Sequence, residues 1–295
     1  MSTTQWDRLI RYISARDGKV HYGEPIINEA GHLGIDDQAR DGTLRVRRLN
    51  GSSAVTATAT DEEDEVTQLL GPLTAAEVPI VRCIGLNYKT HIAEAGLSLP
   101  KYPMLFFKPK HTVADTFASI PIPKIGQLKC DYEGELTIVI GRDAKNVSED
   151  DALDYVAGYV VGNDLSCRDW QADKEKAGAP QQFCFSKSFD QYAPLGPAIV
   201  STEVLGECKE SRIRTWVNDE LRQDSSTAEL VFGVRKLVSF LSMGQTLEAG
   251  SLIMTGTPGG IGHAIKPTPK YLQDGDEVVV EIEGIGKLRN TIKFE

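Results

Sequence analysis

The most informative segment of the chain is Asp131-Tyr-Glu-Gly-Glu-Leu-Thr-Ile-Val-Ile140. Its apolar second half predicts a buried β-strand, in which successive side chains point to opposite faces. Glu133 and Glu135 then share one face, while the apolar side chains at alternate positions from Leu136 to Ile140 share the other. Two carboxylates about 7 Å apart on one strand face repel each other. The pair therefore either faces solvent or binds a divalent cation that removes the repulsion.

A third carboxylate for such a cation follows the next apolar run. Asp164 comes directly after residues 156–162, where a predicted strand ends, although a turn or helix-cap aspartate is the alternative there. Ligation by Glu133, Glu135 and Asp164 uses oxygen atoms alone, which suits a hard ion. The expected cofactor is Mg²⁺, with Mn²⁺ and Ca²⁺ as alternatives. Three protein ligands leave coordination positions open for water and substrate.

Strand signals extend from this segment in both directions. Residues 1–60 contain short apolar runs separated by glycine turns, which predicts a β-rich unit. The acidic run 61–65 indicates a solvated linker or a helix start. The sequence thus predicts a mixed α+β fold that is predominantly β, with a small β-rich N-terminal region at 1–75 and a larger domain at 76–295.

Helical signals are fewer. Residues 88–95 have helical texture, and Ser148 with the acidic residues after it predicts a helix start. Apolar residues at helical spacing predict a further helix within 225–243. Segments 277–282 and 287–292 predict a closing hairpin.

The composition excludes several classes of protein. Of the 295 residues, 41% are hydrophobic and 25% are charged, which is ordinary for a globular protein and excludes disorder as the main state. No apolar run reaches about 18 residues, so a membrane span is excluded. The 32 basic and 42 acidic residues give a net charge of −10, which argues against nucleic-acid binding but permits a small anionic substrate.

The cysteines indicate a reducing compartment. Their number is five, which is odd, and no C-x-x-C pair occurs. A zinc site and a disulfide framework are therefore not expected, and we interpret all the cysteines as buried reduced thiols. Segment 8–16 has some features of a transit peptide, but a first strand is the better interpretation. The expected location is the cytoplasm, with mitochondria as the alternative.

Three further residues have side chains suited to catalysis. Lys187 lies in the apolar alternating segment 183–189, where it is either a structural counter-ion or a group that orients an anion or stabilises an enolate. His91 and Glu94 are three residues apart and would share one face of a helix. A glutamate that holds the histidine tautomer makes the histidine a general base for water. An isolated H-x-x-E pair also occurs without any function.

A glycine-rich loop follows the predicted buried strand 251–254. It reads Met254-Thr-Gly-Thr-Pro-Gly-Gly-Ile-Gly262 and matches neither a P-loop nor the G-x-G-x-x-G pattern. One interpretation is a tight structural turn. The other is an anion site to which backbone amides and the Thr257 hydroxyl contribute.

Six motifs occur in one order along the chain. They are Gly85-Leu-Asn-Tyr-x-x-His-x-x-Glu94, Phe107-Lys-Pro109, Asp131-Tyr-Glu-x-Glu-Leu136, Asn163-Asp-x-Ser-x-Arg-Asp-Trp-Gln171, Ser186-Lys-Ser-Phe-Asp190 and Thr255-Gly-Thr-Pro-x-Gly-x-Gly262. In this combination the chain resembles the fumarylacetoacetate hydrolase superfamily, and it is most similar to the short fumarylacetoacetate hydrolase domain-containing proteins. The resemblance covers residues 80–295.

The resemblance implies a β-sandwich roll with few helices, usually in a homodimer. It also implies that Mg²⁺ binds to the three carboxylates named above and that Lys187 is the active-site lysine. His91 and Glu94 match the dyad of a mobile lid helix found in many members of the family.

The resemblance also indicates how substrate binds. Thr257, with Gly256 beside it, matches a contact to the substrate carboxylate, and Arg168 and Gln171 match positions near the site. Members of the family act on 2-oxo acids and β-dicarbonyl acids. The partner is therefore expected to be a small anionic 2-oxo acid, with no nucleic acid and no membrane.

These expectations favour one reaction among several. The leading hypothesis is Mg²⁺-dependent C–C hydrolysis of an acylpyruvate-type substrate through a metal-stabilised enolate, because the dyad of His91 and Glu94 could activate water. The alternatives are an oxaloacetate decarboxylase or an oxaloacetate keto–enol tautomerase, which need the enolate but no attacking water. A non-catalytic metal-binding member of the family is the remaining alternative.

Overall fold

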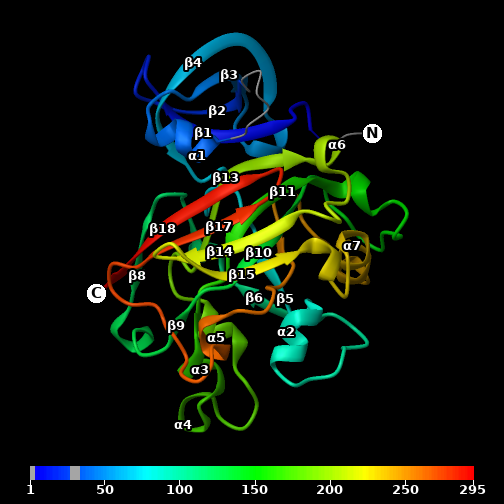
Figure 1. Cartoon of the computed structure of the whole chain (residues 1–295). Coiled ribbons are helices and arrows are strands. Elements are labelled where there is room, and N and C mark those ends of the chain that lie inside the picture. Colours follow the sequence, from blue (N-terminus) through cyan, green and yellow to red (C-terminus); the bar gives the residue numbers. More distant parts are fainter. Residues whose placement is uncertain (1–3, 27–33) are drawn as a thin grey trace.

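The computed structural model describes residues 4–26 and 34–295 of the chain. Within these residues, one sheet has eleven strands and a second has five, and a short ladder joins β9 (Cys130–Asp131) to β12 (Ser166–Cys167). Figure 1 shows β1–β4 at one end of the molecule and α3, α4 and α5 at the opposite end. The fold is predominantly β with short helices, as the sequence predicts.

The bounds of the elements are as follows. The larger sheet has the order β2 (Val20–Pro25), β3 (Arg45–Asn50), β4 (Thr58–Leu70), β1 (Arg8–Ser14), β13 (Ala193–Ser201), β11 (Val156–Asn163), β10 (Gly134–Ile140), β16 (Leu252–Met254), β5 (Val81–Gly85) and β6 (Met104–Lys108), and β7 (Val113–Ala114) pairs with β13. The smaller sheet has the order β15 (Glu220–Ser226), β14 (Arg212–Val217), β17 (Glu277–Ile282), β18 (Gly286–Phe294) and β8 (Ser119–Ile122). The helices are α1 (Ile35–Arg40), α2 (Lys89–Glu94), α3 (Arg168–Ala172), α4 (Lys174–Ala177), α5 (Phe183–Lys187), α6 (Thr202–Leu205) and α7 (Val234–Ser242).

The main core lies between the two sheets. Strands β10, β11 and β13 are buried along their whole length, which explains their nearly continuous apolar sequences. Leu136, Ile138 and Ile140 of β10 pack in one cluster with apolar residues of β17, whereas Val139 faces a second cluster on the other side of the sheet. The alternation predicted for this strand is therefore confirmed.

The N-terminal strands join the larger sheet through β1. This strand pairs with β2 and β4 and also with β13, where Arg8 is opposite Val200. Backbone hydrogen bonding is thus continuous between the N-terminal strands and the rest of the sheet. The division at residue 75 remains a prediction, because the hydrogen bonding alone does not separate two domains.

The acidic run 61–65 is part of β4, so its prediction as a linker or helix start is wrong. The neighbouring strand β3 supplies the opposite charges: Arg45 contacts Glu63 at 2.7 Å, and Arg48 contacts Glu62 at 3.6 Å. Cross-strand pairs of opposite charge stabilise an antiparallel ladder. These acidic residues therefore remain in a strand because their partners are arginines rather than other acids.

Three other local predictions differ from the structure. The helix start at Ser148 leads only to a short 3₁₀ turn at Ala152–Tyr155. The helix within 225–243 begins at Val234, because the preceding residues extend β15 and a 3₁₀ turn. Segment 183–189 contains α5 rather than a strand, and its i,i+4 residues Phe183 and Lys187 line the same cavity.

The closing hairpin is confirmed as β17 and β18, which pair in antiparallel register. Among the residues that the structure describes, no helix combines the length and the apolar character needed to cross a membrane.

Candidate active site

The pairing of β10 with β11 brings the predicted metal ligands together. Gly134 is opposite Asn163 in this ladder, and the Asp164 N–H continues it by donating to the Glu133 carbonyl at 2.9 Å. The Asn163 side chain accepts a hydrogen bond from the Glu133 N–H at 3.0 Å. A Cβ at Gly134 would lie 2.4 Å from Thr215 Oγ1, so only glycine allows the second sheet to approach between the two glutamates.

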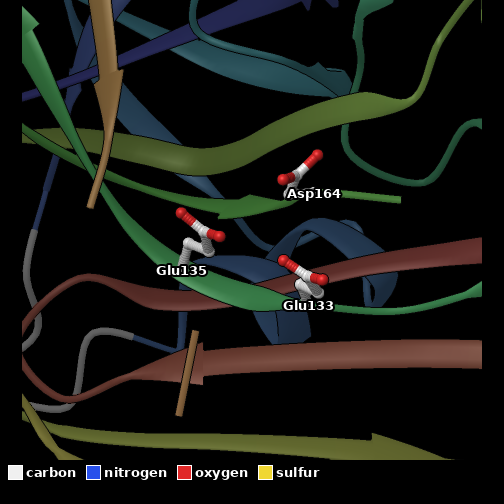
Figure 2. A group of neighbouring side chains, drawn as sticks. All are labelled: Glu133, Glu135 and Asp164. Carbon is white, nitrogen blue, oxygen red and sulfur yellow. The ribbon is translucent and has the colours of Figure 1, made fainter. Parts of the chain in front are cut away.

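The three carboxylates form one buried cluster. One oxygen atom from each of Glu133, Glu135 and Asp164 lies within 4.8 Å of the others, and all three residues are buried (Figure 2). Glu135 accepts a hydrogen bond from the Gly256 N–H at 2.7 Å. Burial, together with the charges of Asp164 and Glu133, raises the pKa of Glu135 well above its usual value. This carboxylate is therefore the one whose ionisation most needs a further cation.

Lys187 contacts the other two carboxylates. Its Nζ donates to Asp164 Oδ2 at 2.8 Å and to Ser166 Oγ at 2.6 Å, and it lies 3.0 Å from Glu133 Oε2. Burial alone would lower the pKa of Lys187, but Asp164 and Glu133 outweigh it and raise the pKa. Burial alone would raise the pKa of Glu133, but Lys187 and Arg168 hold that pKa at about 2. Lys187 and Glu133 are therefore both charged at neutral pH.

Sequence reasoning assigned no role to Lys108, which completes the contacts of Asp164. Lys108 is fully buried, and its Nζ donates to Asp164 Oδ1 at 2.5 Å and to the Tyr192 carbonyl at 2.6 Å. Its place in the motif Phe107-Lys-Pro109, beside an apolar strand, was the available signal. Asp164 is thus held between two lysines.

Asp131 is a second buried residue that sequence reasoning left without a role. Its carboxylate accepts hydrogen bonds from Arg168 Nε at 2.8 Å and from the N–H groups of Gly262 and His263 at 2.8 and 3.0 Å. Arg168 also contacts Glu133 through Nη1 at 2.6 Å. Asp131, at the end of β9, therefore connects the segment that leads to the two glutamates with the glycine-rich loop and with α3.

The donor set fits a hard divalent cation. Glu133 and Asp164 contact cationic side chains, whereas the hydrogen bond to Glu135 comes from a backbone amide. A buried carboxylate that accepts from a backbone amide and faces two other carboxylates is an arrangement that a bound cation stabilises. Glu133, Glu135 and Asp164 are the residues that could hold such an ion, and oxygen ligands are those that Mg²⁺, Mn²⁺ and Ca²⁺ prefer.

A cavity of about 420 Å³ opens beside this cluster. Its polar lining includes His91, Glu94, Glu133, Arg168, Gln171, Gln181, Lys187, Thr257, His263 and Lys266. Its apolar lining includes Ile84, Leu86, Leu97, Met104, Phe106, Phe183 and Ile261. Lys187 Nζ lies 5.3 Å from the centre of the Phe106 ring, which stacks on Phe183. The cavity is thus lined by charged side chains on one side and by aromatic side chains next to them.

The predicted dyad lies on α2 at this cavity. His91 Nδ1 is 3.3 Å from Glu94 Oε2, and the two side chains are 15% and 25% exposed. The other oxygen of Glu94 accepts a hydrogen bond from the Gly260 N–H at 3.0 Å. A Nδ1–H···Glu94 contact leaves the Nε2 lone pair of His91 free to accept a proton.

The residues predicted to bind substrate differ in where they lie relative to the cavity. Thr257 and Gln171 line the cavity, and Gln171 accepts a hydrogen bond from Arg168 Nη1 at 2.9 Å. The Thr257 hydroxyl donates to the Gly134 carbonyl at 3.0 Å. The Gly256 N–H donates a hydrogen bond to Glu135, so this amide positions a metal-ligand candidate. Their roles in binding substrate remain predictions.

Comparison with known proteins identifies the family. A family model described as fumarylacetoacetate (FAA) hydrolase C-terminal matches residues 80–293. The chain belongs to the fumarylacetoacetate hydrolase family. The resemblance inferred from the six motifs is therefore confirmed, and with it the fold class.

The relatives within the fumarylacetoacetate hydrolase family carry the names of several enzymes. A caffeoylpyruvate hydrolase of Neonothopanus nambi is 40% identical over 302 residues, which cover 99% of this chain and 95% of the relative. An oxaloacetate tautomerase of Xenopus laevis, named as mitochondrial, is 40% identical, and the match covers 97% of this chain and 90% of the relative. The crystal structure of a 2-hydroxyhepta-2,4-diene-1,7-dioate isomerase from Mycobacterium marinum superposes with a TM-score of 0.77 at 31% identity, covering 98% of both chains.

Proposed function

We propose that this protein is a metal-dependent enzyme that hydrolyses a C–C bond in an acylpyruvate. The observation that carries the proposal is the contact between His91 and Glu94 at a cavity that also reaches Glu133 and Lys187. A base for water and a cationic group for a developing oxyanion therefore line the same cavity. The relative named caffeoylpyruvate hydrolase, which matches almost the whole chain, supports this choice.

The proposed cofactor is Mg²⁺, held by Glu133, Glu135 and Asp164. When bound, it would supply Lewis-acid charge to the oxygen atoms of a 2-oxo acid. Lys187 and Arg168 support binding of the same anionic substrate, because both carry positive charge and both line the cavity.

The chain's own residues then account for the remaining steps. The positive charge of Lys187, at the cavity wall, stabilises the enolate that forms on the pyruvate part when the bond at C3 breaks. His91 Nε2 accepts a proton from water, and the resulting hydroxide adds to the distal carbonyl carbon. The bond between this carbon and C3 breaks, and C3 then takes a proton. The products are a carboxylic acid and pyruvate.

The apolar wall of the cavity is where the acyl group is proposed to bind. Phe106 and Phe183 stack with ring centres 5.5 Å apart, on the side of the cavity next to Lys187. An acyl group larger than a methyl group could bury apolar surface against them. Oxaloacetate has no such group, and this difference favours an acylpyruvate.

Oxaloacetate tautomerisation is the second candidate function. It is favoured by the Xenopus laevis relative, which is named an oxaloacetate tautomerase. Tautomerisation and decarboxylation use the same enolate but need no attacking water. The role of His91 therefore distinguishes the candidates, and a non-catalytic protein would show none of these reactions.

The test is a panel of acylpyruvates, oxaloacetate and enol-oxaloacetate, each assayed with Mg²⁺ and with EDTA. Wild type should cleave an acylpyruvate only with the metal. His91→Ala should lower hydrolysis by roughly 10²–10⁴-fold, which is the usual contribution of a general base, and should lower decarboxylation much less. Absence of acylpyruvate cleavage in wild type would overturn the proposal in favour of the oxaloacetate reactions.

Two further parts of the proposal concern the whole molecule. The enzyme is proposed to act as a homodimer and in the cytoplasm. Light scattering coupled to size-exclusion chromatography measures the first, and a monomeric mass would contradict it. Cell fractionation measures the second, and recovery in mitochondria would contradict it.

A further inference from the structure

Helix α2, which carries His91 and Glu94 and which we call the lid helix after the resemblance, is attached at its base by buried hydrogen bonds. Asn87, which is fully buried, donates from Nδ2 to the carbonyls of Phe232 and Thr255 at 3.1 and 2.8 Å. Its Oδ1 accepts from the Phe232 N–H at 2.9 Å, and its carbonyl accepts from the Val231 N–H at 2.8 Å. The chain therefore enters the helix from a fixed point.

The helix also accepts two hydrogen bonds from the glycine-rich loop. The Gly259 N–H donates to Thr90 Oγ1 at 3.1 Å, and the Gly260 N–H donates to Glu94 Oε1 at 3.0 Å. Thr90 and Glu94 are four residues apart, so they lie on the same face of the helix. Both contacts are exposed to solvent, in contrast to those of Asn87.

The loop is held in place independently of the lid helix. The Gly260 carbonyl accepts a hydrogen bond from the Tyr132 hydroxyl at 2.8 Å. Gly260 has a φ of +100°, and a Cβ there would lie 2.1 Å from the Arg222 carbonyl, so the loop backbone packs directly against β15. The Gly259 and Gly260 amides are thus presented to the helix from a supported backbone.

We propose that Thr90 is a positioning residue that holds the lid helix, and with it His91 and Glu94, against the Gly259–Gly260 amides. The inference rests on the proposed function, in which the dyad activates water. A helix of six residues is not stable alone, so its position depends on the burial of Ile92 and on contacts such as these. Glu94 contacts both His91 and the Gly260 amide, so a substitution there would change both contacts. The Thr90 hydroxyl accepts from the Gly259 amide, so a substitution at Thr90 tests docking of the helix alone.

The test compares two substitutions at one position. Thr90→Val removes the hydroxyl and keeps the shape, whereas Thr90→Ser keeps the hydroxyl. Lys89→Met is the matched control, because Lys89 lies on the same helix and its side chain is half exposed, with a long contact to Glu229 at 3.9 Å. The measurements are kcat and KM for acylpyruvate hydrolysis, and hydrogen exchange of the Gly259 amide and of residues 88–97.

Loss of one hydrogen bond of this type should reduce kcat/KM by up to about tenfold in Thr90→Val. The Gly259 amide and the lid segment should exchange faster by a similar factor, while Thr90→Ser and Lys89→Met behave as wild type. The proposal is overturned if Thr90→Val matches wild type in exchange or in kcat/KM, or if Thr90→Ser is equally impaired. If wild type cleaves no acylpyruvate, the proposed function fails and the exchange data alone decide the role of Thr90: faster exchange in Thr90→Val supports it, and unchanged exchange overturns it.

Discussion

Lys108 donates a hydrogen bond to Asp164 across 2.5 Å, and neither side chain is exposed to solvent. Two charges removed from water in this way depend on each other, because removing one leaves the other buried without compensation. The pair therefore contributes both to the fold and to the position of a proposed metal ligand.

The first prediction concerns this pair. Lys108→Met should destabilise the protein by about 3–5 kcal/mol, which is typical when one partner of a buried ion pair is removed. The control is Lys236→Met, since Lys236 contacts Glu149 at 2.7 Å with both side chains about half exposed. That variant should lose less than about 1 kcal/mol. Urea unfolding measures both, and equal losses would show that the buried pair has no special role.

The second prediction separates the two glutamates in the metal-free protein. Glu135→Gln removes a carboxylate that its neighbours repel, so the variant should be at least as stable as wild type. Glu133→Gln leaves Lys187 and Arg168 with one partner fewer and should cost roughly 2 kcal/mol. The sequence alone predicts the same effect for both positions. Denaturant titration in EDTA measures the difference, and a destabilised Glu135→Gln would contradict it.

Metal removal gives a third prediction for the same variants. Mg²⁺ stabilises the folded state if it binds only there, so it should raise the melting temperature of wild type in a concentration-dependent way. EDTA should reverse the increase. Glu133→Gln and Glu135→Gln should show a much smaller shift, each because one ligand is lost. An equal shift in Glu135→Gln would remove this residue from the metal site.

The fourth prediction concerns pH and a residue far from the cavity. Asp36 of α1 is buried, and burial followed by the charge of Asp37 raises its pKa. The folded state therefore binds this proton more tightly than the unfolded state does. As a result, the free energy of unfolding falls as pH rises from about 4, near the pKa of Asp36 in the unfolded chain, through the raised pKa in the folded state. Asp36→Asn should therefore gain stability over wild type across this window.

The neighbouring residue Asp37 gives a second variant for the same effect. The charge of Asp37 contributes to the raised pKa of Asp36, so Asp37→Asn should lower that pKa and weaken the loss of stability with rising pH. Unfolding free energies from pH 4 to pH 8 measure both variants. A difference between Asp36→Asn and wild type that stays constant with pH would contradict the raised pKa.

Local patterns explain which parts of the structure could be predicted from the sequence. The alternation after Glu135 is repeated along one strand, and Asp164 follows a run that only a buried strand explains. Both signals are short-range, so the metal-ligand candidates could be found without the fold. The dyad on α2 was found for the same reason, since its residues are three apart.

The missed residues depend on contacts between distant segments. Lys108 is 56 positions from Asp164, and Asp131 is 37 positions from Arg168. No periodicity in one sequence connects such pairs. Lys187 lies on a helix rather than in the alternating segment that the sequence indicates, because a five-residue helix is too short for its period to be distinguished from alternation.

The last prediction follows from a cysteine that the sequence analysis placed incorrectly. All five cysteines lie in the described residues, and Cys184 is exposed rather than buried. The others are buried, and burial raises the pKa of each thiol: Cys83, Cys130, Cys167 and Cys208. A thiol without thiolate character and without access to solvent does not react.

Native protein should therefore consume one equivalent of a thiol reagent quickly, Cys184→Ser should consume none, and unfolded wild type should consume five. Fast reaction of a second thiol in the native protein would show that the core around it opens, and would contradict the burial described here.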